Sequence, residues 1–150
     1  MADKTYTEKV RGTIEQTAAL LFGIVFLVVG IAGFIPGATT DFDRLGTIGG
    51  EGAHLLGIFG VNWLENIVHL IYAAAGLWVA TNAVRSRSYF LWGGAVYGVI
   101  GLYGMLTDVQ SDANFLGVNE AGNWLHLTLF VTMVGLGFYF SKNRDAAALA

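Results

Sequence analysis

The chain has no cysteine, a single proline among 150 residues, and only 13% charged residues. Without cysteine, disulfides, iron–sulfur clusters and thiolate metal sites are excluded. The net charge of −3 is too small to indicate a nucleic-acid partner. The chain also lacks the Walker, GxSxG and HExxH motifs of nucleotide-binding proteins, serine hydrolases and zinc proteases. We therefore expect no nucleic-acid partner and no enzyme activity.

Apolar residues and glycine fill the chain instead. Hydrophobic residues make up 55% of it, and there are 21 glycines. A soluble domain carries about 25% charged residues, and glycine is more frequent in transmembrane helices than in soluble ones. Four apolar runs are each about long enough to cross a hydrocarbon core of roughly 30 Å. They cover residues 17–35, 61–83, 89–106 and 119–140. The sequence thus predicts an all-α membrane protein with four transmembrane helices in a bundle.

The loops between these spans differ in length. Residues 37–60 form the longest loop, and we expect its apolar end, 55–59, to form a short helix in the membrane interface. Residues 85–88 are expected to form a tight turn. His54 and the acidic residues of the first loop match no known cation-binding pattern, so a solvated loop is predicted there. These loop acids are Asp41, Asp43 and Glu51.

Basic residues predict the orientation. Seven of the eight, all except Arg44, fall on one side of the predicted spans. They are Lys4, Lys9, Arg11, Arg85, Arg87, Lys142 and Arg144. Because cytoplasmic loops carry the excess of Lys and Arg, both termini are predicted in the cytoplasm of a bacterial cell, with a multi-pass chain in the inner (plasma) membrane. A photosynthetic membrane stays open as the alternative.

One twelve-residue string occurs twice. Residues 59–70 (FGVNWLENIVHL) and 116–127 (LGVNEAGNWLHL) are identical at six positions. Residues 23–33 and 94–104 match at five of eleven. We therefore predict one integral membrane domain, 1–150, built from two parallel two-helix repeats, about 17–84 and 89–141. Two helices per unit give both units the same direction, so the axis relating them should lie along the membrane normal.

The repeated string carries a stripe of polar residues. On a helix, positions i, i+4 and i+7 fall within an arc of about 60°. The stripe consists of Asn62, Asn66, His69, Asn119, Asn123 and His126. We expect it to face the interior near the outer surface, because polar groups facing lipid find no hydrogen-bond partner. The first asparagine of each copy is expected to cap its helix.

Three interpretations of the stripe remain open. In the first, it is a polar clamp in which His69 bonds Asn123 or a neighbouring backbone, and His126 does the same in reverse. In the second, the two histidines bind a cofactor such as haem iron or a pigment. In the third, they line a pocket for a quinone headgroup or another small polar ligand. We expect no cofactor and no metal site. Glu65 and Glu120 do not align with each other and are expected to extend to the outer interface.

The string from Val28 to Gly37, the Gly-Val-Asn-Trp of residues 60–63 and the Asn-Trp-Leu-His-Leu of residues 123–127 resemble a bacterial family of small four-helix membrane proteins. That family is catalogued only as a domain of unknown function. The resemblance covers roughly residues 17–140. It implies a bacterial integral membrane protein and implies no activity, substrate or cofactor.

The expected function is therefore that of a small non-catalytic membrane protein, an accessory or structural subunit of a membrane complex. One alternative is a haem-, pigment- or quinone-binding redox subunit that uses His69 and His126. A second alternative is an oligomeric transporter or channel. Glycines at helical spacing allow helices to approach closely. These glycines are expected to form the contacts between helices of one chain. The alternative is that they form the contacts between chains of a homo-oligomer.

Overall fold

The computed structural model describes residues 12–148, with side chains up to residue 142. Lys4, Lys9 and Arg11, the Arg144 side chain and the chain ends lie outside the described part. The α-helices are α2 (Ile14–Ala32), α3 (Trp63–Val79), α4 (Ala83–Leu106) and α5 (Glu120–Ala148). The other elements are β1 (Thr39–Thr40), η1 (Phe42–Arg44), β2 (Ala53–Leu55) and β3 (Phe59–Val61). The chain is mostly helical with four α-helices in its described part, as predicted, and the first long loop adds a small three-stranded sheet that was not predicted.

Three helices are long and apolar enough to cross a membrane. They are α2, α4 and the Glu120–Lys142 part of α5. The second predicted span corresponds to α3, a shorter apolar helix of 17 residues. At a rise of about 1.5 Å per residue, α3 is roughly 25 Å long, slightly less than the hydrocarbon core.

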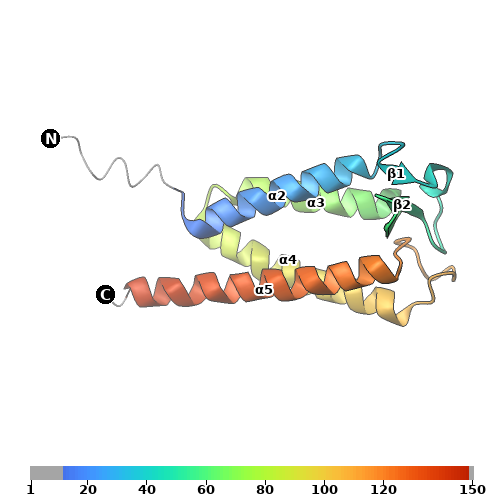
Figure 1. The fold of residues 1–150 in the computed structure, drawn as a ribbon. Helices are drawn as coiled ribbons and strands as arrows, with labels where there is room; N and C mark the ends of the chain where they lie inside the picture. Colours follow the sequence, from blue (N-terminus) through green and yellow to red (C-terminus); the bar gives the residue numbers. More distant parts are fainter. Residues whose placement is uncertain (1–11, 149–150) are drawn as a thin grey trace.

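The helices form two closely packed pairs, α2 with α3 and α4 with α5 (Figure 1). Glycines permit these contacts, since a Cβ at Gly23 would lie 2.8 Å from the backbone nitrogen of Leu77. A Cβ at Gly94 would lie 3.0 Å from the backbone nitrogen of Val134. Each pair can therefore pack backbone against backbone, as small residues allow in membrane helices.

Buried aromatic side chains join the two pairs. Phe26 of α2, Tyr72 of α3 and Tyr97 of α4 lie with ring centroids 4.5–5.6 Å apart. The Tyr72 hydroxyl donates to the Gly93 carbonyl oxygen, and the Tyr89 hydroxyl donates to the Tyr72 carbonyl oxygen. Large apolar side chains such as those of Leu21, Ile71, Trp92 and Val99 are exposed. An outer surface with so many apolar side chains is suited to lipid.

The turn between α3 and α4 lies earlier than predicted. Residues 85–88 belong to α4, and the turn is formed by residues 80–82. The Asn82 side chain accepts a hydrogen bond from the Arg85 backbone N–H and so starts the helix at Ala83. The predicted tight turn at 85–88 is therefore wrong, because an asparagine cap placed the helix start before the basic residues.

The predicted interfacial helix at 55–59 is also wrong. Strands β2 and β3 form an antiparallel hairpin there, and β1 pairs with β2 on the other side. Leu56 and Gly57, between the strands, have φ angles of 55° and 70°. Two consecutive residues with positive φ are typical of a tight hairpin turn and end any helix. The sheet lies at one end of the helices, opposite the start of α2 (Figure 1).

Candidate functional site

Helix α3 begins with the side chains that build the site. Asn62 caps the helix, and its Oδ1 accepts a hydrogen bond from the Glu65 backbone N–H at 3.0 Å. Glu65, Asn66 and His69 follow at the third, fourth and seventh positions after the cap, so they share one face of the helix. All three are buried, and Glu65 is only 1% exposed. The start of α3 thus directs a carboxylate and an imidazole into the protein.

Helix α5 brings the second imidazole to the same place. Asn119 caps this helix by accepting from the Gly122 backbone N–H at 3.0 Å. His126 follows and is buried, with its Nε2 3.0 Å from Oε1 of Glu65. Nε2 of His69 lies 3.9 Å from the same oxygen. The predicted caps at Asn62 and Asn119 are both observed. We call Glu65, His69 and His126 the Glu–His–His cluster.

From the sequence, Glu65 was expected to extend to the outer interface, but its side chain is buried. Gly122, which aligns with Glu65 in the repeated string, lines the same cavity as the carboxylate. A Cβ at Gly122 would meet Asn119, Gly60 and Val118 rather than Glu65, so the close contact of the carboxylate with α5 is the one with His126. Glu120, by contrast, is exposed. The available signal was the position of Glu65 three residues after Asn62, beside the arc of the stripe and on the same face of the helix.

The remaining asparagines of the stripe do not pair with the histidines. Asn66 lies against Gly33, the residue after the end of α2, and Asn123 lies against Gly104 of α4. The predicted bond between His69 and Asn123, and its reverse, are absent among the hydrogen bonds of residues 12–142. Instead both histidines approach Glu65. The clamp interpretation therefore had the wrong partners.

Many polar atoms of this region are buried without a hydrogen-bond partner in the described part of the chain. The 3.0 Å approach of His126 to Glu65 does not have the alignment of a hydrogen bond. The unpartnered atoms are both carboxylate oxygens of Glu65, both amide atoms of Asn66, Nδ1 of His69 and His126, Oδ1 of Asn123 and the hydroxyl of Tyr97. Since buried polar groups in proteins are nearly always paired, this concentration indicates a binding site.

Aromatic rings hold the imidazoles in place. The Phe26 ring stacks on His69 at a centroid distance of 5.9 Å, and the Tyr97 ring lies 5.4 Å from His126. Phe26 and Tyr97 are themselves nearly parallel, at 5.6 Å. The two histidines are thus linked by a continuous series of ring contacts through Phe26 and Tyr97.

Two cavities reach the cluster and share Val29, His69 and Leu125. One, of about 100 Å³, contains Glu65 and His126 and is covered by residues of β2 and β3. The other, of about 290 Å³, runs between α2 and α5 along Phe22, Val25, Phe26 and Leu129. We call this pair of cavities the α2–α5 groove. A larger cavity of about 430 Å³, near Trp78 and Trp92, lies away from the cluster and contains none of the unpartnered polar atoms.

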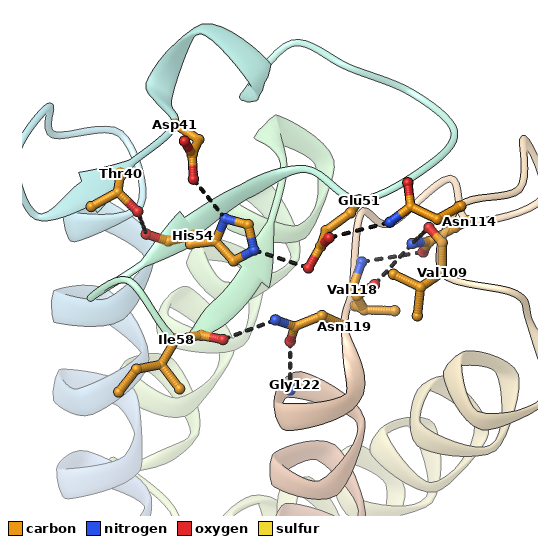
Figure 2. Close-up of polar contacts among 11 residues, drawn as sticks. Thr40, Asp41, Glu51, His54, Ile58, Val109, Asn114, Val118, Asn119 and Gly122 are labelled. Carbon is orange, nitrogen blue, oxygen red and sulfur yellow. Dashed lines mark hydrogen bonds and ion pairs between the residues drawn. The ribbon is translucent and has the colours of Figure 1, made fainter.

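A network of polar contacts joins the two long loops to each other (Figure 2). His54 of β2 lies between Asp41 and Glu51, with ring nitrogens 3.0 and 2.9 Å from their carboxylate oxygens. Glu51 also accepts from the Gln110 side chain of the second long loop. The Asn119 side chain donates to the Ile58 carbonyl oxygen at 2.9 Å. The two loops therefore form one cover above the Glu–His–His cluster.

Most of the chain matches one known protein family. Residues 16–139 match the model of a family described as "Domain of unknown function (DUF4383)". No curated protein and no solved structure matches the chain.

Proposed function

Because the chain belongs to this family of unknown function, we propose its role from the site itself. It is a non-catalytic integral membrane protein, an accessory subunit of a membrane complex, that binds a lipid-phase molecule with a polar ring head, of the quinone class. The observation that carries the proposal is that Glu65, His69 and His126, three buried residues with unpartnered polar atoms, line an otherwise apolar groove.

The two parts of the groove match the two parts of such a ligand. Carbonyl oxygens of a quinone accept hydrogen bonds, and the imidazole N–H groups of His69 and His126, which line the groove, can donate them. The walls along α2 and α5 are apolar and suit an isoprenoid tail. A haem or pigment macrocycle is supported less well, because the Glu65 carboxylate lies beside both imidazole Nε2 atoms, where the flat ring around a central metal would need space.

We also propose that the four helices form a transmembrane bundle of two repeats. Reciprocal hydrogen bonds support this. The Asn62 side chain donates to the Phe115 carbonyl oxygen, and the Asn119 side chain donates to the Ile58 carbonyl oxygen. Donors and acceptors are both offset by the 57 residues that separate the two strings. Each cap therefore reaches the loop of the other half, as two-fold related units would.

Glycine contacts support the same arrangement. Gly30 lies against Leu70, and its counterpart Gly101 lies against Leu127. Gly33 and Gly104 likewise lie against Asn66 and Asn123. Each pair of contacts follows the alignment of the repeats.

The proposed orientation places the sheet and both long loops outside, with both termini in the cytoplasm of a bacterial inner membrane. Arg85 and Arg87 lie near the start of α4, at the end of the helices opposite the sheet, whereas Arg44 lies in η1 beside it. This asymmetry agrees with the excess of basic residues in cytoplasmic loops.

Filling the groove should abolish ligand binding. A decyl-tailed quinone should raise the melting temperature of the purified protein in detergent, because it binds only the folded state. Val25→Trp places a large side chain in the groove and should weaken the apparent affinity at least about tenfold, the equivalent of roughly 1.4 kcal/mol. Titration of the melting temperature against quinone concentration measures this.

The matched control is Val28→Trp. Val28 lies on the same helix and is 61% exposed, against 59% for Val25, but it does not line the groove. Val28→Trp should respond to quinone like the wild type, and decanol should stabilise neither. Equal stabilisation of both tryptophan variants, or no effect on the wild type, would contradict the proposal.

A further inference from the structure

The Glu–His–His cluster has the composition of a metal site, which goes beyond the proposed ligand of the groove. We infer that Glu65, His69 and His126 bind a divalent first-row transition-metal ion such as Zn²⁺ or Fe²⁺. Two imidazoles and one carboxylate are the protein ligands of several zinc and non-haem iron centres. The inference does not depend on a quinone, because the three side chains come from the protein alone.

The separations of the donor atoms suit a single ion. One donor atom from each of the three residues lies within 4.8 Å of the others. Oε1 of Glu65 is 3.0 Å from Nε2 of His126 and 3.9 Å from Nε2 of His69. Donors about 2.0–2.2 Å from an ion are roughly 3.0–3.5 Å apart at angles between octahedral and tetrahedral. Small side-chain rotations would therefore bring all three into one coordination sphere.

Burial explains why an ion is needed there. A carboxylate that is 1% exposed and lacks hydrogen bonds is costly unless a cation compensates its charge. The nearby groups facing Glu65 are the two imidazoles and, further along the stack, the Tyr97 ring; the described part of the chain places no Lys or Arg in this cavity. A divalent cation bound by Nε2 of each neutral imidazole would compensate the charge of the carboxylate.

Three protein ligands leave coordination positions open. The small cavity at the cluster provides the space for them, and it joins the larger part of the groove at Val29, His69 and Leu125. An ion at this place would be accessible to small molecules and lipid-phase ligands from the groove, as in metal sites that keep one position for an exchangeable ligand.

The test uses Co²⁺ alone as the probe. The full-length protein in detergent is treated with a chelator, titrated with Co²⁺, desalted and analysed for metal content and visible ligand-field absorption. Wild type should retain about one Co²⁺ per chain with a nitrogen-containing ligand spectrum. Glu65→Gln and His126→Gln should each weaken binding at least about tenfold, since each removes one of three ligands.

The matched control is His54→Gln, which removes the histidine that lies between Asp41 and Glu51 in the cover. It should bind Co²⁺ like the wild type. Loss of Co²⁺ binding in His54→Gln together with normal binding in Glu65→Gln would show that the metal binds in the cover and would overturn the inference. Normal Co²⁺ binding in every variant would overturn it as well.

Further measurements distinguish the loss of a metal ligand from a failure of the variant to fold. Circular dichroism and gel filtration establish that each variant is folded. If the cluster variants do not fold, X-ray absorption of the wild-type Co²⁺ complex decides, because an all-oxygen ligand shell or no stoichiometric binding overturns the inference. Val25→Trp should bind Co²⁺ normally, so failure of the quinone proposal and failure of the metal inference are distinguishable.

Discussion

Gly23→Leu should lower the melting temperature of the detergent-solubilised protein by about 5–10 °C. A Cβ at this position would lie 2.8 Å from the Leu77 backbone nitrogen and 3.1 Å from the Gly76 carbonyl carbon. Backbone cannot move aside as a flexible side chain can, so α2 and α3 must separate. Overpacking costs about 1–3 kcal/mol, and each kcal/mol shifts the melting temperature by roughly 2–4 °C in a chain of this size.

Gly135→Leu is the control for helix propensity and added apolar surface. Gly135 is exposed in α5, and a Cβ there meets nothing within 4 Å. Its melting temperature should stay within about 2 °C of the wild type, because surface substitutions usually change stability by less than about 0.5 kcal/mol. Equal shifts in the two variants would mean that α2 and α3 do not pack at Gly23.

Asn62→Ala should be the most destabilising change among the helix caps. The side chain is fully buried, accepts from the Glu65 N–H, and donates to the Phe115 and Thr47 carbonyl oxygens at 2.8 and 3.3 Å. Its loss removes a cap and leaves buried backbone groups unpaired, at about 3 kcal/mol in total. We expect a fall in the melting temperature of roughly 6–12 °C.

Asn82→Ala provides the comparison. Asn82 caps α4 at the opposite end, is exposed, and makes one capping bond, to the Arg85 N–H. Its loss should cost about 1 kcal/mol. Differential scanning fluorimetry of both variants measures the difference. A smaller fall for Asn62→Ala than for Asn82→Ala would show that the bonds from α3 to the loops do not stabilise the protein.

The helices were predictable because length and apolarity alone indicate them. Each of the four predicted runs contains one helix, and the predicted resemblance to a family of unknown function is confirmed. The boundary between the second and third runs was missed, since hydropathy locates the charged residues Arg85 and Arg87 but not the hydrogen bond that caps α4 at Asn82.

The sheet was not predictable from periodicity. Its strands are two or three residues long, too short for an alternating pattern to emerge. The turn that closes the hairpin includes Leu56 at positive φ, a conformation that leucine rarely adopts. Pairing between β2 and β3 and their contact with the helices override this local preference.

Glu65 illustrates what a single sequence leaves undetermined. Near the end of a predicted span, a glutamate can reach water along its own helix, and that was the expectation. Its burial depends on α5, from which His126 approaches the carboxylate to 3.0 Å. The repeat aligned Glu65 with Gly122, so the duplication gave no indication of the contact between Glu65 and His126.

Photo-crosslinking tests the central claim, binding of a quinone in the α2–α5 groove, most directly. A quinone with a diazirine on its tail is added to the protein in lipid nanodiscs, irradiated, and the modified peptides are identified by mass spectrometry. We predict adducts concentrated on residues 22–29 of α2 and 125–129 of α5, and competed by unlabelled quinone. Adducts spread evenly over the exposed apolar surface, or concentrated near Trp78 and Trp92, would contradict the proposal.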